Sequence, residues 1–154
     1  MEIVKMLDLN TIISFLPEFH TGAEAIGIAI LRIIWGTTLI FYGLPMLKRP
    51  FTWMDMPKPS GIPGFLQLIG ALTIFGGGIT IALGFLTFLA SLALTGAMGL
   101  ALILNLLKGV PFMKERPDAP GTSYEASLVY LAIALMFVFV GPGVFSLDYL
   151  LFGH

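Results

Sequence analysis

Hydrophobic residues in this chain occur in long unbroken runs, without the one-sided pattern that is typical of helices in soluble proteins. Residues 23–47 form the first run, residues 61–107 form a second run without any charged side chain, and residues 124–140 form a third. A helix needs about 20 apolar residues to cross the hydrocarbon core of a bilayer. The first and third runs therefore predict one transmembrane helix each. The second run is about twice the length of one span and predicts two.

The second run divides best at Gly84 and Thr87, which predicts helices over residues 63–83 and 86–107 joined by a tight turn. The predicted fold is all-α, a four-transmembrane-helix bundle that makes up one membrane domain over residues 23–154. Residues 1–22 predict a short interfacial N-terminal segment, too short in its apolar part to span. The sequence Gly141-Pro142-Gly143 cannot continue a helix, so the apolar tail that follows is expected to lie along the interface.

Composition supports a membrane protein, because 57% of the residues are hydrophobic and only 11% are charged. Soluble domains have about 25% charged residues, so the bilayer is the expected environment. A net charge of −1 provides no field for nucleic acid. The chain has no cysteine, which excludes disulfides, thiolate metal sites and dithiol redox chemistry. His20 and His154 lie outside the predicted spans and have no further ligands in spacing, so no metal site is predicted.

The distribution of basic residues predicts the topology of the bundle. With four spans, loops 48–61 and 108–123 fall on one side of the membrane and carry six Lys or Arg residues, whereas the other side carries only Lys5. Cytoplasmic loops are enriched in Lys and Arg. We therefore expect both loops in the cytoplasm and both ends of the chain on the opposite side.

Arg32 is the sharpest candidate for a functional residue, because it lies about nine residues inside the first span. A charge at that depth is costly and usually faces a partner or a wet cavity. Asp148 follows the Gly-Pro-Gly turn on the same predicted side, and Glu24 lies two turns earlier on the same helix. We expect Arg32 to pair with Asp148, with Glu24 as a second partner. The pair is either a structural clasp or a binding site for an anion or a quinone carbonyl.

The sequence also predicts an ion pair at the helix ends and close packing of the helices through glycines. Glu125 opens the last span, where an acid is favoured by the helix dipole, and Lys48 at the end of the first span is its expected counterion. Small residues at helix-neighbour spacing predict close helix packing; they are Gly36 and Gly43 in the first span and Gly70 and Gly76–Gly78 in the second. The glycine triplet also allows a bend, or a place where a flat ligand lies against the backbone.

Three segments of the chain together resemble the DoxX family of small four-helix membrane proteins. They are LRIIWGTTLIFYGLPMLK (residues 31–48), GGGITIALGFLT (residues 76–87) and the SYEAS…GPGVFSLD pattern (residues 123–148), and the resemblance covers about residues 28–148. It implies that the family's recurring positions are Arg32, Gly36, Gly43, Lys48, Glu125, Gly141, Pro142, Gly143, Ser146 and Asp148. Family members often carry a Glu before the glycines, where this chain has Thr73 or Ile74.

The resemblance implies two functions. One is a membrane subunit of a redox-linked system that holds a quinone or a partner oxidoreductase, with quinone as the possible cofactor. The other is a non-enzymatic accessory or assembly subunit that packs against other membrane proteins, which the uncharged second and third spans favour. A small-solute carrier is a weaker third interpretation, because the spans lack paired polar residues. The residues themselves do not decide whether the chain is an enzyme.

Overall fold

The computed structural model describes residues 17, 19–55, 60–113 and 123–153, and these residues form five helices and no strand. The helices are α2 (Gly22–Leu47), α3 (Gly64–Leu83), α4 (Thr87–Leu107), α5 (Glu125–Val140) and α6 (Leu147–Phe152). The first four coincide within one or two residues with the predicted segments, including the break between α3 and α4. The interfacial helix predicted within residues 1–22 lies largely outside the described residues.

Three of these helices, α2, α3 and α4, are long and apolar enough to cross a membrane. Helix α5 is also apolar but has 16 residues, which corresponds to about 24 Å of helix against a hydrocarbon core of about 30 Å. The chain is therefore an all-helical protein with three membrane-length helices and a shorter apolar fourth. A complete membrane crossing by α5, and the side on which each loop lies, stay predictions.

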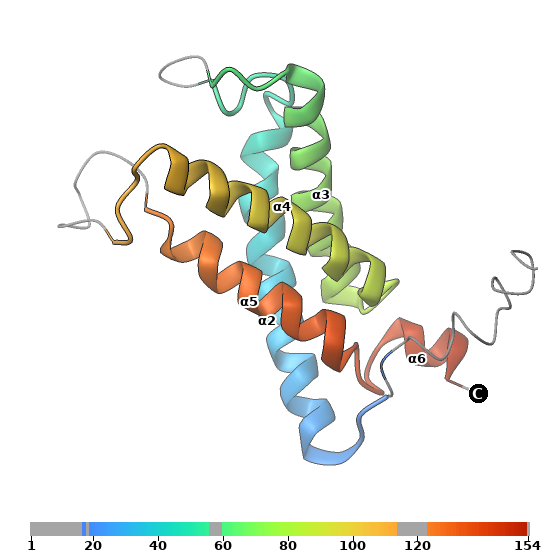
Figure 1. The fold of residues 1–154 in the computed structure, drawn as a ribbon. Helices are drawn as coiled ribbons and strands as arrows, with labels where there is room; N and C mark the ends of the chain where they lie inside the picture. The colour runs from blue at the N-terminus through green and yellow to red at the C-terminus, as the bar shows by residue number, and fades with distance from the viewer. Residues whose placement is uncertain (1–16, 18, 56–59, 114–122, 154) are drawn as a thin grey trace, which may run out of the picture.

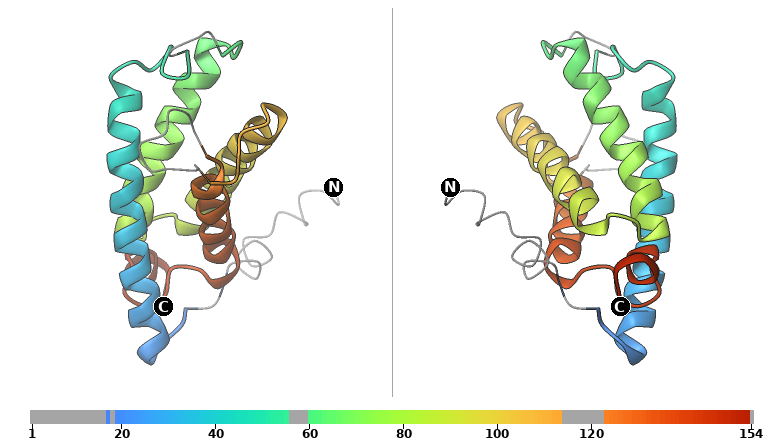
Figure 2. Two further views of the ribbon diagram at one scale, coloured as in Figure 1. Left: turned by 90° about the vertical axis from the view of Figure 1, so that its left-hand side faces the viewer. Right: turned by 90° about the vertical axis from the view of Figure 1, so that its right-hand side faces the viewer.

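The helices form two antiparallel pairs that cross each other (Figure 1). Helices α2 and α3 lie side by side in one pair, and α4 and α5 form the other, with the short α6 next to the turn between α3 and α4. Helices α3 and α4 are close at that turn and diverge away from it (Figure 2). Trp35 of α2 stacks on Phe137 of α5 with ring centroids 5.7 Å apart, which joins the two pairs through the core.

Glycines bring α2 and α3 into backbone contact. A Cβ atom built on Gly36 would lie 2.6 Å from the amide nitrogen of Ala82 and 2.7 Å from the carbonyl oxygen of Gly78. A Cβ atom on Gly43, two turns later, would lie 2.7 Å from the backbone of Phe75. Such close approach is how helices associate in lipid, where burial of apolar surface provides no driving force.

The turn between α3 and α4 contains two residues in the left-handed region. Gly84 ends α3 with φ +68°, a conformation that glycine adopts without steric cost. Leu86 follows with φ +47°, which costs a non-glycine residue roughly 1–2 kcal/mol. Contacts elsewhere in the fold must therefore hold Leu86 in this conformation.

At the opposite end of α3, Gln67 organises the loop that precedes the helix. Its side chain is 1% exposed, its amide nitrogen donates to Asp55 Oδ2 at 3.1 Å and to the carbonyl of Ile62, and its amide oxygen accepts from the backbone of Met54. The indole N–H of Trp53 donates to the Gln67 carbonyl at 2.7 Å. The buried Gln67 side chain thus connects residues 54–55 and residue 62 of the loop to the start of α3.

We expect this loop to loosen only in strong acid. Hydrogen bonds from the Ser60 hydroxyl and amide, and then from Gln67, lower the pKa of the Asp55 carboxyl below its ordinary value of about 3.9. The ionised Asp55 carboxylate therefore stabilises the folded loop fully at pH values above its ordinary pKa. This contribution to the free energy of unfolding is lost as the pH falls through the lower pKa of Asp55 in the folded state. Trp53 fluorescence in a Trp35→Phe protein would report the change. Asp55→Asn should abolish the transition, and a midpoint above about pH 4 in the parent would contradict it.

Candidate functional site

The guanidinium of Arg32 is buried where α2 meets the turn that follows α5. The residue is 3% exposed, Nη1 donates to the Pro142 carbonyl at 2.7 Å, and Nη2 donates to the Phe145 carbonyl. Residues 141–145 are not helical, so the regular hydrogen bonds of a helix do not satisfy their carbonyls. One arginine therefore satisfies two of these carbonyls and fixes the turn against α2.

The carboxylate of Asp148 holds the turn between α3 and α4. Its two oxygens accept from the amides of Leu86 at 2.6 Å and Thr87 at 2.8 Å, and its own amide donates to the Gly84 carbonyl at 2.8 Å. These amides open α4, where the unpaired N–H groups and the helix dipole favour a negative charge. Asp148 is thus a cap supplied from α6, and it accounts for the strained conformation of Leu86.

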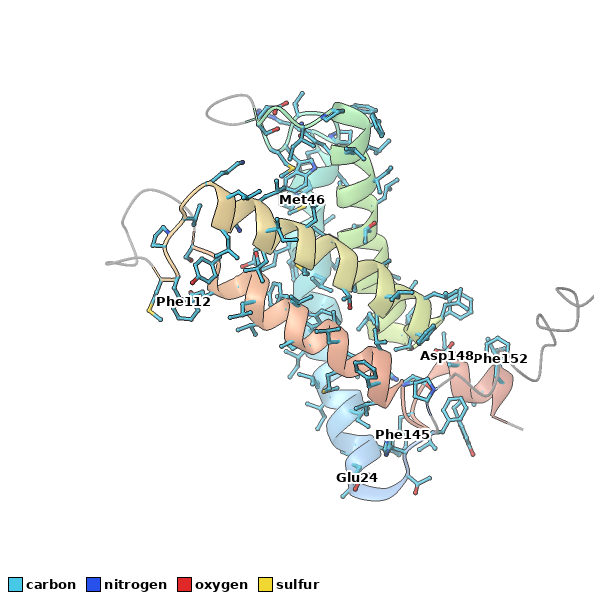
Figure 3. All side chains as sticks on the ribbon, viewed as in Figure 1. Glu24, Met46, Phe112, Phe145, Asp148 and Phe152 are labelled. Carbon is cyan, nitrogen blue, oxygen red and sulfur yellow. The ribbon has the colours of Figure 1, made fainter. Side chains whose placement is uncertain are left out.

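Arg32, the 84–87 turn and residues 142–148 meet at one end of the bundle, and we call this set the clasp. Figure 3 places Phe145 and Asp148 together at this end, beside α6. Ser146 caps α6 by accepting from the amide of Tyr149, and its hydroxyl donates to the Gly143 carbonyl at 2.7 Å. A Cβ atom on Gly84 would lie 2.6 Å from both Arg32 Nη1 and Ser146 Cβ, so only glycine fits there.

The expected direct ion pair between Arg32 and Asp148 is not formed, although the structure brings both residues into the clasp. Within the described residues, no ion pair of 4.0 Å or less joins them. The physical reason is that each charge finds unpaired backbone groups nearer than the other charge. Carbonyl oxygens surround the guanidinium, and helix amides surround the carboxylate. The two residues interact only through longer-range attraction.

Glu24, the second expected partner of Arg32, is directed elsewhere. Its carboxylate lies 3.2 Å from His20 Nδ1, and its side chain is 77% exposed. Lys48 and Glu125 likewise form no ion pair within the described part of the chain. Lys48 ends α2 at its exposed C-cap, whereas Glu125 begins α5, where its amide donates to the Phe112 carbonyl.

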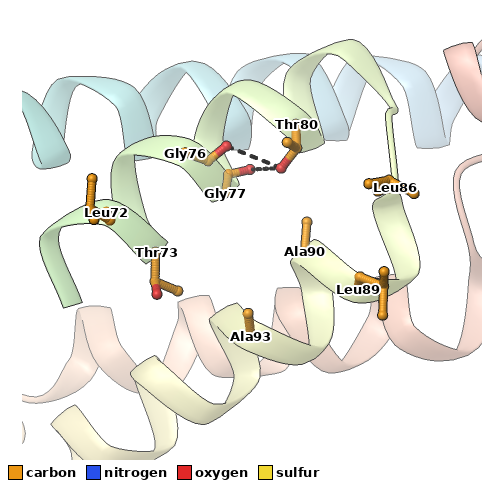
Figure 4. A pocket seen from close by; sticks show the side chains of 9 residues that line it. All are labelled: Leu72, Thr73, Gly76, Gly77, Thr80, Leu86, Leu89, Ala90 and Ala93. Atoms are coloured by element: carbon orange, nitrogen blue, oxygen red, sulfur yellow. Dashed lines mark hydrogen bonds between the residues drawn. The ribbon is translucent and has the colours of Figure 1, made fainter. Parts of the chain in front are cut away.

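The glycine triplet divides between packing and open space. Gly78 packs on α2, and Gly77 lies against Leu94 of α4, but a Cβ atom on Gly76 would meet nothing within 4 Å. Gly76 borders a groove of about 270 Å³ between the diverging helices α3 and α4 (Figure 4). Its lining is aliphatic except for Thr73 and Thr80, and the Thr80 hydroxyl donates to the Gly76 and Gly77 carbonyls.

Several residues of the clasp and the core were not predicted as site residues. Thr87 and Ser91 form the buried face of α4 near the clasp, and Gln67 anchors the loop at the other end of α3. The sequence signal that could have identified these three residues is that each is a polar side chain within a largely apolar helix. Gly84 was predicted as a break, but its contact with Arg32 has no counterpart in the sequence pattern.

The clasp is suited to holding the fold. Its two charged groups are bound by backbone atoms of two separate segments, and both groups are almost fully buried. The described residues contain no group of three or more His, Asp or Glu residues placed to hold a metal ion. A separate feature, the apolar groove between α3 and α4, is suited to an apolar or flat occupant.

Comparison with known proteins shows that the chain is similar to the inner membrane protein YqjF of Escherichia coli (strain K12). The two are 30% identical over 134 residues, which is 83% of this chain and 94% of the relative. No protein-family model matches the chain. No solved structure matches it either.

Proposed function

Because the chain belongs to the same family as the inner membrane protein YqjF, we propose that it is an integral membrane protein acting as a non-enzymatic accessory or assembly subunit of a larger membrane complex. The observation that supports this proposal is that the two buried charged side chains, Arg32 and Asp148, bind backbone groups of the chain itself. The two terminal nitrogens of Arg32 and the two carboxylate oxygens of Asp148 are all bound to backbone groups of this chain, as expected for a structural role.

The outer surface of the bundle fits a subunit that packs against other membrane proteins. Large apolar side chains are exposed along α2, α3, α4 and α5, as expected for contact with lipid or with neighbouring helices. The resemblance of residues 28–148 to the DoxX family, some of whose members look like membrane anchors for redox-defence complexes, supports the same proposal.

A second candidate is a redox-linked subunit that holds a quinone. The groove between α3 and α4 favours it, because a volume of about 270 Å³ is near the lower end of small-molecule sites and Gly76 leaves the backbone open to a flat ring. The chain would then supply a site for the ring, and the electrons would come from a partner protein.

One pair of variants separates the two functions. Gly76→Leu fills the groove, and Gly99→Leu adds the same side chain at another open helical position, on α4 outside the groove. Native-membrane protein is purified in mild detergent, its complex mass is measured, and solvent-extracted quinone is quantified. The accessory-subunit proposal predicts a complex larger than the chain alone and no stoichiometric quinone in the parent protein.

Stoichiometric quinone that is lost in Gly76→Leu and retained in Gly99→Leu would establish the redox-linked function. A monodisperse chain without partner or quinone would contradict both proposals. Because neither added Cβ atom meets anything within 4 Å, both variants should fold.

A further inference from the structure

Among the residues that the structure describes, four buried polar atoms inside the bundle have no hydrogen-bond partner. They are Arg32 Nε and Trp35 Nε1 on α2, and Thr87 Oγ1 and Ser91 Oγ on α4. Each of the four residues is at most 3% exposed. Buried polar atoms almost always have a partner, so four unpartnered atoms in one small bundle require an explanation.

The four atoms belong to two levels, counted from the clasp along α2 and along α4, with one residue of each helix at each level. Arg32 and Thr87 form the first level, since Arg32 contacts Gly84 of the α3–α4 turn and the Thr87 amide binds Asp148. Trp35 and Ser91 lie one helical turn further, about 4.5 and 6 Å along their axes. Trp35 shares a hydrophobic cluster with Leu94, which lies on the same buried face of α4 as Ser91.

The chemistry of the four atoms specifies their ligand. The arginine Nε and the indole nitrogen only donate, whereas the two hydroxyls both donate and accept. A ligand that satisfies them must accept two hydrogen bonds from the nitrogens, and its hydrogen bonds with the two hydroxyls can run in either direction. Water does this with a single atom, and bound waters typically make about three hydrogen bonds to otherwise unsatisfied buried groups.

We propose that a water molecule is bound inside the bundle between α2 and α4, accepting from Arg32 Nε and Trp35 Nε1 and donating to Thr87 and Ser91. The water completes the coordination of Arg32, whose other two nitrogens already donate to the Pro142 and Phe145 carbonyls. With this water bound, all three nitrogens of the buried Arg32 guanidinium have a hydrogen-bond acceptor, although no carboxylate contacts the guanidinium directly. The site is independent of the groove between α3 and α4.

The two tryptophans of the chain provide the test. Full-length protein with ¹⁵N-labelled indoles is placed in lipid bilayers, and magnetisation transfer from water to each indole N–H is measured by solid-state NMR. Trp53 donates to the Gln67 carbonyl in a loop and serves as the internal reference. We expect a dipolar cross-peak between water and the Trp35 indole proton in the parent protein.

The double variant Thr87→Val, Ser91→Ala removes both hydroxyls and should abolish the Trp35 cross-peak while leaving the Trp53 resonance in place. Thr95→Val is the matched control, because the Thr95 hydroxyl is on the same helix and donates to the Ser91 carbonyl; its Trp35 cross-peak should persist. Absence of the cross-peak in the parent protein, or its survival in the double variant, would overturn the proposal.

Discussion

Replacing Arg32 with leucine is expected to reduce the free energy of unfolding by about 3–5 kcal/mol, because two carbonyls lose their donor at about 1–3 kcal/mol each and a buried carboxylate loses a nearby positive charge. The Pro142 and Phe145 carbonyls would lose their donors, and the buried Asp148 carboxylate would lose the nearby positive charge. Denaturation with increasing SDS in mixed micelles, followed by tryptophan fluorescence, measures the change.

Two further variants define what the arginine contributes. Arg32→Lys keeps the charge but loses the planar fork that reaches two carbonyls at once, so its loss should lie between those of leucine and the parent. Lys48→Leu removes a positive charge from the exposed end of α2 and should change stability by no more than about 0.5 kcal/mol. Equal losses in Arg32→Leu and Lys48→Leu would show that the clasp carries no special stability.

Replacing Gly36 with leucine is expected to be as damaging, with a loss at or above the upper end of the usual overpacking range of about 1–3 kcal/mol. The new Cβ atom would lie within 2.9 Å of backbone atoms of Gly78 and Ala82, and backbone atoms cannot move aside as a flexible side chain can. The pair α2–α3 would have to separate. The yield of monodisperse protein and the SDS midpoint measure this effect.

Gly27→Leu is the matched control on the same helix, since a Cβ atom on Gly27 meets nothing within 4 Å. It should gain up to about 1 kcal/mol, because leucine is a better helix former than glycine. If Gly36→Leu retained the parent midpoint, the α2–α3 contact would have to be looser than the structure has it.

The helices could be predicted almost to the residue, and the reason is the solvent. In lipid every backbone polar group must be satisfied within the segment, so apolar runs of sufficient length become helices whatever their tertiary context. Gly84 marked the turn between α3 and α4 because glycine alone adopts the left-handed conformation there at no cost. The end of α5 was equally predictable, because the Gly-Pro-Gly sequence cannot continue a helix although apolar residues follow it.

The sequence pattern predicts that Arg32 and Asp148 lie at the same end of the bundle, and the structure has both residues there. The predicted direct ion pair between them is wrong, because each charge binds backbone groups instead. Opposite charges can be recognised in a sequence, whereas unpaired backbone groups depend on where a turn places them. The amides that bind Asp148 belong to Leu86 and Thr87, about 60 residues earlier in the chain. Leu86 and Thr87 carry no signal for this contact, so pairing Arg32 with the only nearby acids was the simplest hypothesis.

The clasp can form only late in synthesis, because residues 142–148 are the last part of it to be made. Helices α2, α3 and α4 leave the ribosome before residues 142–148, so during that interval the Arg32 guanidinium and the first amides of α4 lack their partners. Leu86 can then relax from its costly left-handed geometry, leaving the first hairpin and α4 loosely connected. A polypeptide truncated before the Gly-Pro-Gly turn would remain permanently in this state, with a costly cation inside the bilayer and no turn carbonyls to accept its hydrogen bonds.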